Sequence, residues 1–288
     1  MSAGGLAATK AGTLIEALPY IRSYRGETVV VKVGGEALDD SALASLVAED
    51  MTLLGLVGIR LIVVHGGGPQ VSAAMLQAGV EPRFVGGLRV TDDASMDLVR
   101  GVLAGSINSD LVAGLCRSGL QAVGLSGADA NLLHAETTTG PGGEDLGRVG
   151  RVVDVSTGLL SALLDDGYTP VIASIALGED GGALNVNADS VAGAVAAGMS
   201  ASKLVYLTNV EGLYRDLGDE GSLVSEIKLG EIKGMLGGLS AGMRPKAESA
   251  IEALESGVGK VHILDGRVKH ALLLEIFTQE GIGTQVLP

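Results

Sequence analysis

The chain alternates between short, wholly apolar runs and longer stretches with the apolar spacing of a helix. Runs such as TVVVKV at 28–33 and RLIVV at 60–64 are typical of strands buried on both faces. Stretches such as 41–58 and 241–257 place apolar residues three or four positions apart and predict helices. This alternation predicts an α/β fold with a mainly parallel sheet, whose ligands bind outside the carboxyl ends of the strands.

A separate helix is predicted ahead of the first strand, over residues 12–25. The large aliphatic residues on one side of this helix are Leu14, Ile15, Leu18 and Ile21. Pro19 has no N–H to donate and its ring clashes with the preceding turn, so we expect it to kink or break the helix.

The middle of the chain departs from the alternation. Residues 131–155 have alternating segments around a Gly/Pro-rich tip and predict a hairpin. Two helices are expected before it, at 94–103 and 109–117, and one strand after it, at 168–177. No repeat or low-complexity linker divides the chain.

Composition narrows the class of protein. With two Phe, five Tyr and no Trp, the core has to be packed by Val, Leu, Ile and Ala, which fits a sheet covered by helices. The net charge of −14 argues against a general nucleic-acid surface. Cys116 is the only cysteine, and no leader or run of about 18 apolar residues is present, so we expect a cytoplasmic protein without a membrane span.

Two glycine-rich loops follow predicted strands. In VVVKVGG, Lys32 precedes Gly34 and Gly35, and in VVHGGGPQ three glycines follow His65. The bare N–H groups of such loops can converge on an anion, and a lysine beside them suits phosphate. The alternatives are a lysine that extends to solvent and a plain strand-to-helix turn. Neither loop matches the P-loop or the dinucleotide-binding pattern, and we interpret His65 as structural.

Two further positions carry charge near predicted strand ends. Arg89 in GGLRVTD can bind a carboxylate through two parallel hydrogen bonds, although taken alone it fits a surface arginine as well. In NVNADSVAGAV, either Asn187 or Asp189 can cap a helix. Asp189 can equally organise cationic residues at a phosphate site.

Together these motifs resemble the amino acid kinase family. They occur in the order found in that family, from about Glu16 to the C-terminus: VVVKVGG, VVHGGGPQ, GGLRVTD, GLSGADANLL, NVNADSVAGAVAAG, KLVYLTNVEGLY, SAGMRPKAESA and DGRVKHALLLEIFTQEGIGT. The resemblance implies a three-layer αβα sandwich around a mainly parallel eight-stranded sheet. Within the family, the chain resembles the members that phosphorylate the γ-carboxylate of N-acetyl-L-glutamate with ATP and Mg²⁺ in arginine biosynthesis.

The resemblance also implies roles for individual residues. Lys32 and Lys246 match two lysines that neutralise the transferring phosphoryl group, and Asp189 matches the carboxylate that positions them. The implied substrate contacts are Gly67, Gly68, Arg89 and Asn185. The implied ATP contacts are Gly34, Gly35, Thr208, Asn209, Gly212, Leu213, Tyr214, Gly238, Ser240 and Lys246. No protein metal ligand is implied, since Mg²⁺ is held mainly by phosphate oxygens and water.

Three regions are expected on this basis. Residues 1–26 resemble the N-terminal helix that joins dimers into hexamers in arginine-inhibited members, residues 27–177 form a lobe for the acyl-amino acid, and residues 178–288 form a lobe for ATP. An inhibitory arginine site is implied near the C-terminus. Its implied contacts are Lys203, His270, Glu275, Glu280 and Gly281. The alternatives are a simple packed arm and an ordinary final helix with an edge strand.

Three residues depart from the family pattern, and the substrate stays open. Asn209 stands where relatives often carry Asp, Arg244 where an apolar residue is usual, and Lys269 where proline is usual. Arg89 and Asn185 would recognise the shared end of N-acetylglutamate and of an N-acylated aminoadipate. A non-catalytic arginine or nucleotide sensor is a third hypothesis, which the presence of both phosphate lysines disfavours.

Overall fold

The computed structural model describes all residues except 1–2, 35–39, 217, 241 and 279–280. At the centre of the described residues is an eight-stranded sheet in the order β14-β16-β15-β11-β1-β2-β8-β5. Neighbouring strands are parallel except for β15 and β16. The strands are β1 (Thr28–Val33), β2 (Arg60–His65), β5 (Ala122–Leu125), β8 (Thr169–Ala173), β11 (Lys203–Thr208), β14 (Glu226–Lys228), β15 (Val261–Asp265) and β16 (Thr284–Leu287). The predicted mainly parallel sheet is confirmed.

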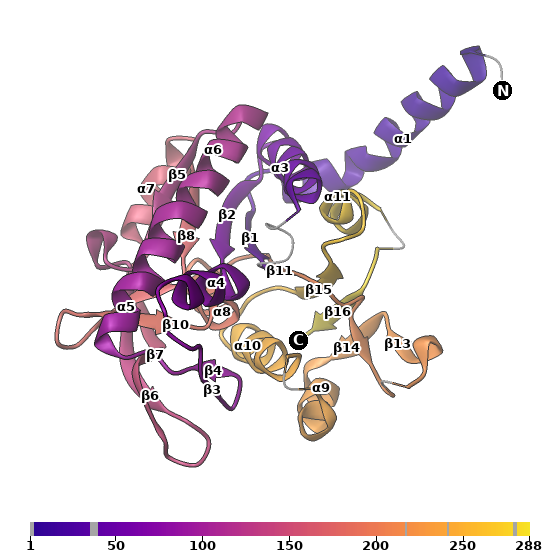
Figure 1. Ribbon diagram of the computed structural model, residues 1–288. Coiled ribbons are helices and arrows are strands. Elements are labelled where there is room, and N and C mark those ends of the chain that lie inside the picture. Colours follow the sequence, from indigo (N-terminus) through magenta and orange to yellow (C-terminus); the bar gives the residue numbers. More distant parts are fainter. Residues whose placement is uncertain (1–2, 35–39, 217, 241, 279–280) are drawn as a thin grey trace.

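Helices cover both faces of this sheet and make a three-layer sandwich (Figure 1). The helices on one face are α3 (Ser41–Leu56), α6 (Asn108–Ser118) and α11 (Ala271–Phe277). The helices on the other face are α7 (Gly158–Asp165), α8 (Ala188–Gly198) and α10 (Arg244–Glu255).

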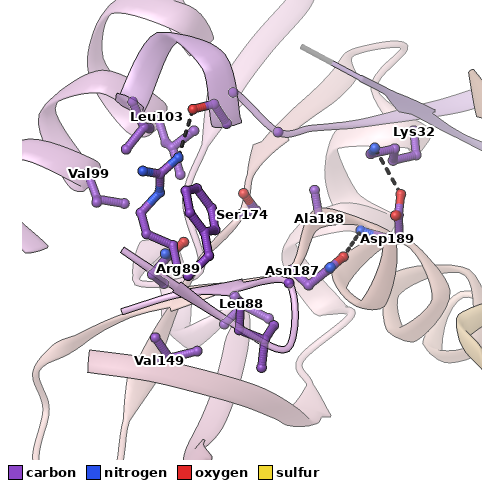
Figure 2. Close-up of a pocket in the computed structure, with 18 residues that line it drawn as sticks. Lys32, Leu88, Arg89, Val99, Leu103, Val149, Ser174, Asn187, Ala188 and Asp189 are labelled. Atoms are coloured by element: carbon purple, nitrogen blue, oxygen red, sulfur yellow. Dashed lines mark hydrogen bonds and ion pairs between the residues drawn. The ribbon is translucent and has the colours of Figure 1, made fainter. Parts of the chain in front are cut away.

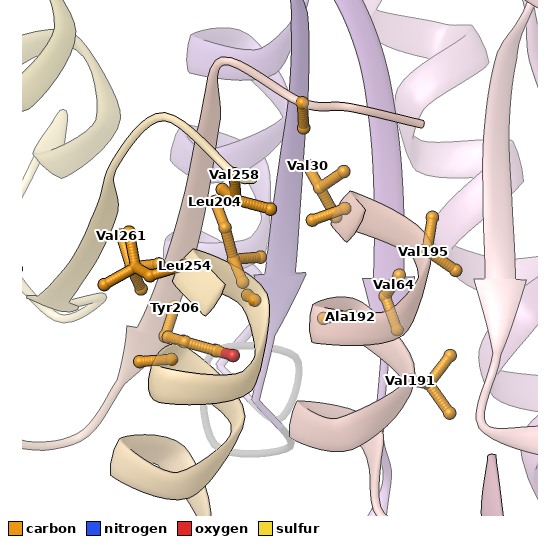
Figure 3. Close-up of a cluster of buried hydrophobic side chains, with 14 of the residues drawn as sticks. Val30, Val64, Val191, Ala192, Val195, Leu204, Tyr206, Leu254, Val258 and Val261 are labelled. Atoms are coloured by element: carbon orange, nitrogen blue, oxygen red, sulfur yellow. The ribbon is translucent and has the colours of Figure 1, made fainter. Parts of the chain in front are cut away.

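The central strand β1 contributes to the hydrophobic cores on both faces. Val30 belongs to the same core cluster as Val191 and Val195 of α8 on one side (Figure 3), and Val29 joins the core under α3 and α11 on the other. Successive side chains of a strand point to opposite faces, so a strand covered on both sides has to be apolar. Lys32 is the charged exception among the buried residues of β1.

Four short strands form a closed barrel separate from the main sheet. They are β6 (Leu133–Thr139), β7 (Asp145–Val155), β9 (Ile175–Gly178) and β10 (Ala183–Val186). β6 and β7 confirm the predicted hairpin, whose tip protrudes in Figure 1. The prediction of one strand over 168–177 is wrong, because the chain bends at Ser174 and β9 pairs with β6 and β10 instead. Ala173 and Ile175 are both buried, so the apolar run gave no sign of the bend.

The predicted N-terminal helix is present as α1 (Ala3–Tyr24), and the expected break at Pro19 is wrong. Side chains on both sides of the proline, among them Ala17 and Ile21, pack on the core under α3 and α11. These contacts outweigh the one hydrogen bond that proline removes. The first part of α1 projects away from the body (Figure 1), and Leu14 on it is 73% exposed.

The two helices expected at 94–103 and 109–117 belong to one continuous helical run. It consists of α5 (Asp93–Arg100), a π-helix η1 (Gly101–Ile107) and α6. Within the described part of the chain, this run over Asp93–Ser118 is long and apolar enough to cross a membrane by length and composition alone. Its Val99 and Leu115 side chains are fully buried in the hydrophobic cores, while 22% of its most apolar 18-residue segment is buried.

The remaining elements surround the carboxyl ends of the central strands or connect the layers. They are α4 (Gly68–Gln77), β3 (Phe84–Val85), β4 (Leu88–Arg89), β12 (Leu213–Tyr214), β13 (Leu223–Val224), α9 (Leu229–Met235) and the 3-10 turns Asp129–Asn131, Glu220–Ser222 and Leu236–Gly238.

Candidate active site

Two lysines far apart in the sequence converge on one buried carboxylate. Lys32, near the carboxyl end of β1, places its Nζ 2.8 Å from Asp189 Oδ1 (Figure 2), and Lys246 in the first turn of α10 donates to Asp189 Oδ2 at 3.0 Å. Burial by itself would raise the pKa of Asp189, but the two lysines outweigh it and hold the pKa below its ordinary value. The carboxylate is therefore ionised at neutral pH and holds two cations in place. The alternative of a solvent-extended Lys32 is excluded, since this residue is 8% exposed.

The backbone of Asp189 is itself held by two polar neighbours, one of which is supported by a third residue. Asn187 is the N-cap of α8, and its Oδ1 accepts a hydrogen bond from the Asp189 N–H at 2.8 Å. Ser249 Oγ donates to the Asp189 carbonyl at 2.7 Å, and the Tyr206 hydroxyl donates to Ser249 Oγ at 2.7 Å. These bonds keep α8 and α10 in register. Sequence reasoning missed Ser249 and Tyr206, for which the only signals are a serine one turn after Lys246 and a tyrosine in an apolar strand.

Arg89 is a buried cation whose partners, among the described residues, are neutral. Its Nη2 donates to the Gly68 carbonyl and to Ser72 Oγ, both at 2.8 Å, and its guanidinium carbon lies 4.7 Å from the centre of the Phe84 ring. Burial lowers the pKa of Arg89, but a guanidinium stays charged at neutral pH. Since an unpaired buried charge is unfavourable, a carboxylate arriving here is attracted strongly. The alternative of Arg89 as a surface residue is excluded, because this residue is 8% exposed.

Lys32, Asp189 and Arg89 line one cavity of about 240 Å³, called here the active-site cavity (Figure 2). Asn185 also lines it, and its Nδ2 donates to Thr91 Oγ1 at 3.2 Å. Thr91 Oγ1 in turn donates to the Arg89 carbonyl at 2.9 Å, so Asn185 and Arg89 are tied together. A cation stands at each end of this cavity, which suits a small molecule with two anionic groups.

The glycine loop after β2 supplies backbone donors to the same cavity. Gly67 is the N-cap of α4 and Gly68 is its first residue, so the first N–H groups of this helix have no acceptor within the helix. Gly66, Gly67 and Gly68 all line the active-site cavity. Free amides at the start of a helix can bind anions. The position of this loop beside the charged residues of the cavity therefore favours a ligand-binding loop over a plain strand-to-helix turn.

The expected nucleotide residues are not among the described residues that line this cavity. Those that the structure describes are Gly34 after β1, Thr208 and Asn209 at the end of β11, Gly212, Leu213 and Tyr214 around β12, and Gly238 and Ser240 before α10. A Cβ atom added to Gly34 would lie 3.9 Å from Lys32 Nζ, so this backbone is close to the lysine. Gly35 lies outside the described residues.

The three departures from the family pattern lie at the surface or near it. The Nε of Arg244 is 3.7 Å from Glu248 Oε1, an exposed pair one turn apart in α10. Thr208 Oγ1 donates to Asn209 Oδ1 at 3.4 Å. Lys269 is exposed in the turn before α11.

Three of the expected arginine contacts meet in a second cavity of about 400 Å³, called here the C-terminal cavity. Lys203, Glu275 and Gly281 line it together with Tyr24 of α1, and Lys203 Nζ lies 4.9 Å from the centre of the Tyr24 ring. Burial lowers the pKa of Lys203 to about 8, although Glu275 opposes this shift. Burial would raise the pKa of Glu275, but the buried His262 and Lys203 hold it below its ordinary value. Sequence reasoning gave no role to His262.

Of the other two expected arginine contacts, Glu280 and His270, only His270 can be placed, and it does not line this cavity. His270 precedes α11, and its Nδ1 lies 2.7 Å from Oδ1 of the buried Asp50 in α3. Glu280 lies outside the described residues. Nothing in the part of the chain that the structure describes forms a group of three or more His, Cys, Asp or Glu placed to hold a metal ion.

Comparisons with known proteins agree with this geometry. Residues 27–265 match the model of the "Amino acid kinase family". The chain is 51% identical to the acetylglutamate kinase of Symbiobacterium thermophilum, over 96% of this chain and 97% of that protein, and 48% identical to the one from Thermoanaerobacter pseudethanolicus, over 96% and 93%. A solved structure of N-acetylglutamate synthase from Neisseria gonorrhoeae, complexed with coenzyme A and N-acetyl-glutamate, is similar at a TM-score of 0.86 and 33% identity. That match covers 96% of this chain but 63% of the synthase. This chain belongs to the amino acid kinase family.

Proposed function

We propose that this chain transfers the γ-phosphoryl group of ATP to the γ-carboxylate of N-acetyl-L-glutamate, releasing ADP and N-acetyl-L-glutamyl 5-phosphate in arginine biosynthesis. The observation that carries the proposal is the Asp189 carboxylate held between Lys32 and Lys246, with Lys32 and Asp189 lining the same cavity as Arg89. Near full-length similarity to two acetylglutamate kinases supports the same reaction.

In this proposal the substrate spans the active-site cavity. Arg89 binds its α-carboxylate and Asn185 its acetamido group, which brings the γ-carboxylate toward Gly67 and Gly68. The γ-carboxylate is ionised at neutral pH, so it attacks the γ-phosphorus without a general base. Among the described residues that line the cavity, Asp189 is the one carboxylate, and its two oxygens face lysines.

Catalysis then depends on positioning and on neutralising the phosphoryl oxygens. Lys32 on the acceptor side and Lys246 on the nucleotide side balance the charge that spreads over them, and Asp189 keeps both ammonium groups oriented. Mg²⁺ supplies further neutralisation when bound with the nucleotide and is held mainly by phosphate oxygens and water.

We assign the acyl-amino acid to the lobe of residues 27–177 and ATP to residues 178–288. The short strand β10 follows that boundary but pairs with β7 and β9 of the first lobe, so Asn185 reaches the substrate from the second region. The nucleotide would lie along 208–214 and 238–246, at the ends of β11 and α10. We further propose a cytoplasmic location, which suits the single cysteine Cys116.

A coupled assay of ADP release tests the reaction. N-acetyl-L-glutamate and N-acetyl-L-aminoadipate are offered side by side with ATP and Mg²⁺, and we expect turnover with the first. Preference for aminoadipate would replace the substrate but keep the reaction. Binding of nucleotide without turnover of either compound would leave the sensor hypothesis instead.

We also propose that arginine inhibits the enzyme through the C-terminal cavity and that α1 joins dimers into a hexamer. Lys203 and Glu275 offer a cation and an anion to a zwitterion, and Tyr24 brings α1 to the same cavity. On the projecting part of α1, Leu14 and Ile15 are 73% and 68% exposed, which suits a helix that packs on another subunit.

Two measurements test these regulatory proposals. Sedimentation of the wild type is expected to show hexamers, and of Leu14→Glu to show dimers, because a charge on the apolar side of α1 opposes burial. Dimers alone in the wild type would refute the hexamer. Activity unchanged by millimolar arginine would refute the inhibition.

A further inference from the structure

The glycine loop after β2 is held by hydrogen bonds to each of its three carbonyl groups. Val71 N–H binds the Gly67 carbonyl at 2.9 Å, and Arg89 binds the Gly68 carbonyl at 2.8 Å. The Gly66 carbonyl lies 3.0 Å from His65 Nδ1. Because glycine is the most flexible residue, these bonds decide where the loop amides point.

The neighbours of His65 determine its tautomer. Asn108 Nδ2 lies 2.9 Å from the Val171 carbonyl and 3.0 Å from His65 Nε2. A carbonyl can only accept, so the amide nitrogen of Asn108 has to face Val171, and His65 Nε2 has to accept from it. The ring proton is therefore on Nδ1 and is donated to the Gly66 carbonyl.

A second proton on His65 would place two donors face to face at Nε2. His65 is 0% exposed and Asn108 is 5% exposed, so water cannot relieve that conflict. Burial also lowers the pKa of His65, which acts in the same direction. The imidazole stays neutral and keeps its Nδ1–H on Gly66.

The π-helix η1 brings Asn108 to this place. Asn108 is the first residue after η1, and two residues within η1, Leu103 and Ile107, pack against the loop itself. A Cβ atom added to Gly67 would lie 2.2 Å from Ile107 Cδ1 and 2.8 Å from Leu103 Cδ2. One residue more or less per helix turn rotates the rest of the helix by about 100°, so the wide π turns decide which side chains face the loop.

We propose that His65 and Asn108, set in place by the π-helix, are positioning residues that aim the Gly67 amide at the acceptor carboxylate. The peptide between Gly66 and Gly67 is planar, so its N–H points opposite to the carbonyl that His65 holds. The Gly67 N–H is thereby turned away from the imidazole. This inference rests on the proposed function, since the acceptor is the carboxylate of N-acetyl-L-glutamate.

A spectrum of the wild type tests the hydrogen-bond arrangement without substrate. Long-range ¹H–¹⁵N spectra of the imidazoles, with His65 assigned by its loss in His65→Gln, are expected to show a neutral Nδ1–H ring at about pH 6, where exposed histidines are largely protonated. A Nε2–H tautomer or a protonated His65 would overturn the proposal, whatever the enzyme phosphorylates.

Kinetics of Asn108→Asp test the positioning. A carboxylate there repels the Val171 carbonyl and draws a second proton onto His65, so the loop shifts. We expect kcat/KM for N-acetyl-L-glutamate to fall about 100-fold, as small misplacements at reacting groups do, with the KM for ATP little changed. The matched control is Ser109→Ala, at the exposed neighbouring position, which should behave as wild type.

Three outcomes are distinguishable. Wild-type constants in Asn108→Asp would overturn the positioning role, and so would equal losses for both substrates. Asn108→Ala, which removes both donated bonds without adding charge, should show the same selective loss to a smaller degree. Failure of the wild type to use N-acetyl-L-glutamate would refute the proposed function, while the imidazole spectrum would still report on the hydrogen bonds.

Discussion

The active-site cavity and the C-terminal cavity both bury charged groups, but with a different balance. Around the first, Lys32, Lys246 and Arg89 stand against the single carboxylate of Asp189. In the second, Lys203 faces Glu275, and the further lining residues include one more cation and one more anion. A cation excess in a buried site requires an anionic ligand, whereas a balanced one suits a zwitterion.

The two sites also differ in how their charges are held. The backbone of Asp189 is held by the side chains of Asn187, at the N-cap of α8, and of Ser249 in α10. Its two lysines come from β1 and α10. Lys203 is held in part by the Tyr24 ring on α1, a helix that projects beyond the body. A catalytic site has to keep one geometry, while a regulatory site has to respond to its ligand. Four predictions test this contrast, starting with the largest expected effect.

Lys246→Ala and Lys32→Ala should each lower kcat by about 10²- to 10³-fold, because one of the two charges on the transferring phosphoryl group is lost. Melting temperatures should change little, since Asp189 keeps its other lysine. A coupled assay measures kcat, and a thermal unfolding curve measures the melting temperature. Lys233→Ala, an exposed lysine in an ion pair, is the control, and near-normal turnover in either catalytic variant would remove that lysine from the mechanism.

Arg89→Lys should raise the KM for N-acetyl-L-glutamate by about 10- to 100-fold, the worth of a lost charge-assisted hydrogen bond. A lysine has no planar fork of N–H groups, so it cannot hold a carboxylate through two parallel hydrogen bonds while it also donates to the Gly68 carbonyl and Ser72. The KM for ATP should hardly change. Arg83→Lys, on the same loop but exposed, provides the comparison, and a loss confined to kcat would contradict the substrate role of Arg89.

Arginine inhibition should weaken as the pH rises through about 8, where buried Lys203 loses its proton. The folded-state pKa lies below the unfolded value of 10.5, so this deprotonation also relieves the cost of burying the charge, and stability from this group rises with pH between these values. The test compares the arginine concentration that gives half inhibition about one pH unit below and above 8, and we expect a higher concentration above 8. In Lys203→Met the pH dependence should vanish, and its survival there would assign the effect to another group.

Ser249→Ala should destabilise the fold by about 1 kcal/mol, since it removes two buried hydrogen bonds that join β11, α8 and α10. Because these bonds set the register between Asp189 and Lys246, kcat should fall several-fold as well. Denaturant unfolding measures the free energy of unfolding, and the coupled assay measures kcat. The matched control is Ser256→Ala, at an exposed position after α10. If Ser249→Ala keeps wild-type stability and kcat, Ser249 does not position Asp189 and Lys246.

Much of the fold followed from local patterns. The sheet was predicted from the apolar runs of β1 and β2, because a strand buried on both faces has to be apolar. The hairpin was predicted from the Gly/Pro-rich tip between β6 and β7, because tight turns favour these residues. The bend at Ser174 and the continuity of α1 through Pro19 were missed. Both are decided by packing against distant segments, which no local pattern records.

The candidate site divides in the same way. Glycines and charged residues at strand ends identified Lys32, Arg89 and Asp189 as candidates, since such residues are unfavourable there without a ligand. From the sequence, His65 is interpreted as structural, and neither Asn108 nor Ser249 is singled out, because their importance lies in which atoms they face. His270 was expected at the C-terminal cavity, but the structure pairs it with Asp50 instead.

The sequence by itself therefore determined the α/β alternation, the strands buried on both faces and the residue types available for phosphate and carboxylate recognition. The family resemblance implied that Asp189 positions Lys32 and Lys246, and the tertiary structure supplies the contacts that do so. The tertiary structure alone decided that Asn108, the first residue after the π-helix, bonds to the histidine of the glycine loop. Hydrophobic periodicity is a property of neighbours along the chain. The direction of a donor or the pairing of a charge depends instead on groups that only folding brings within 3 Å of one another.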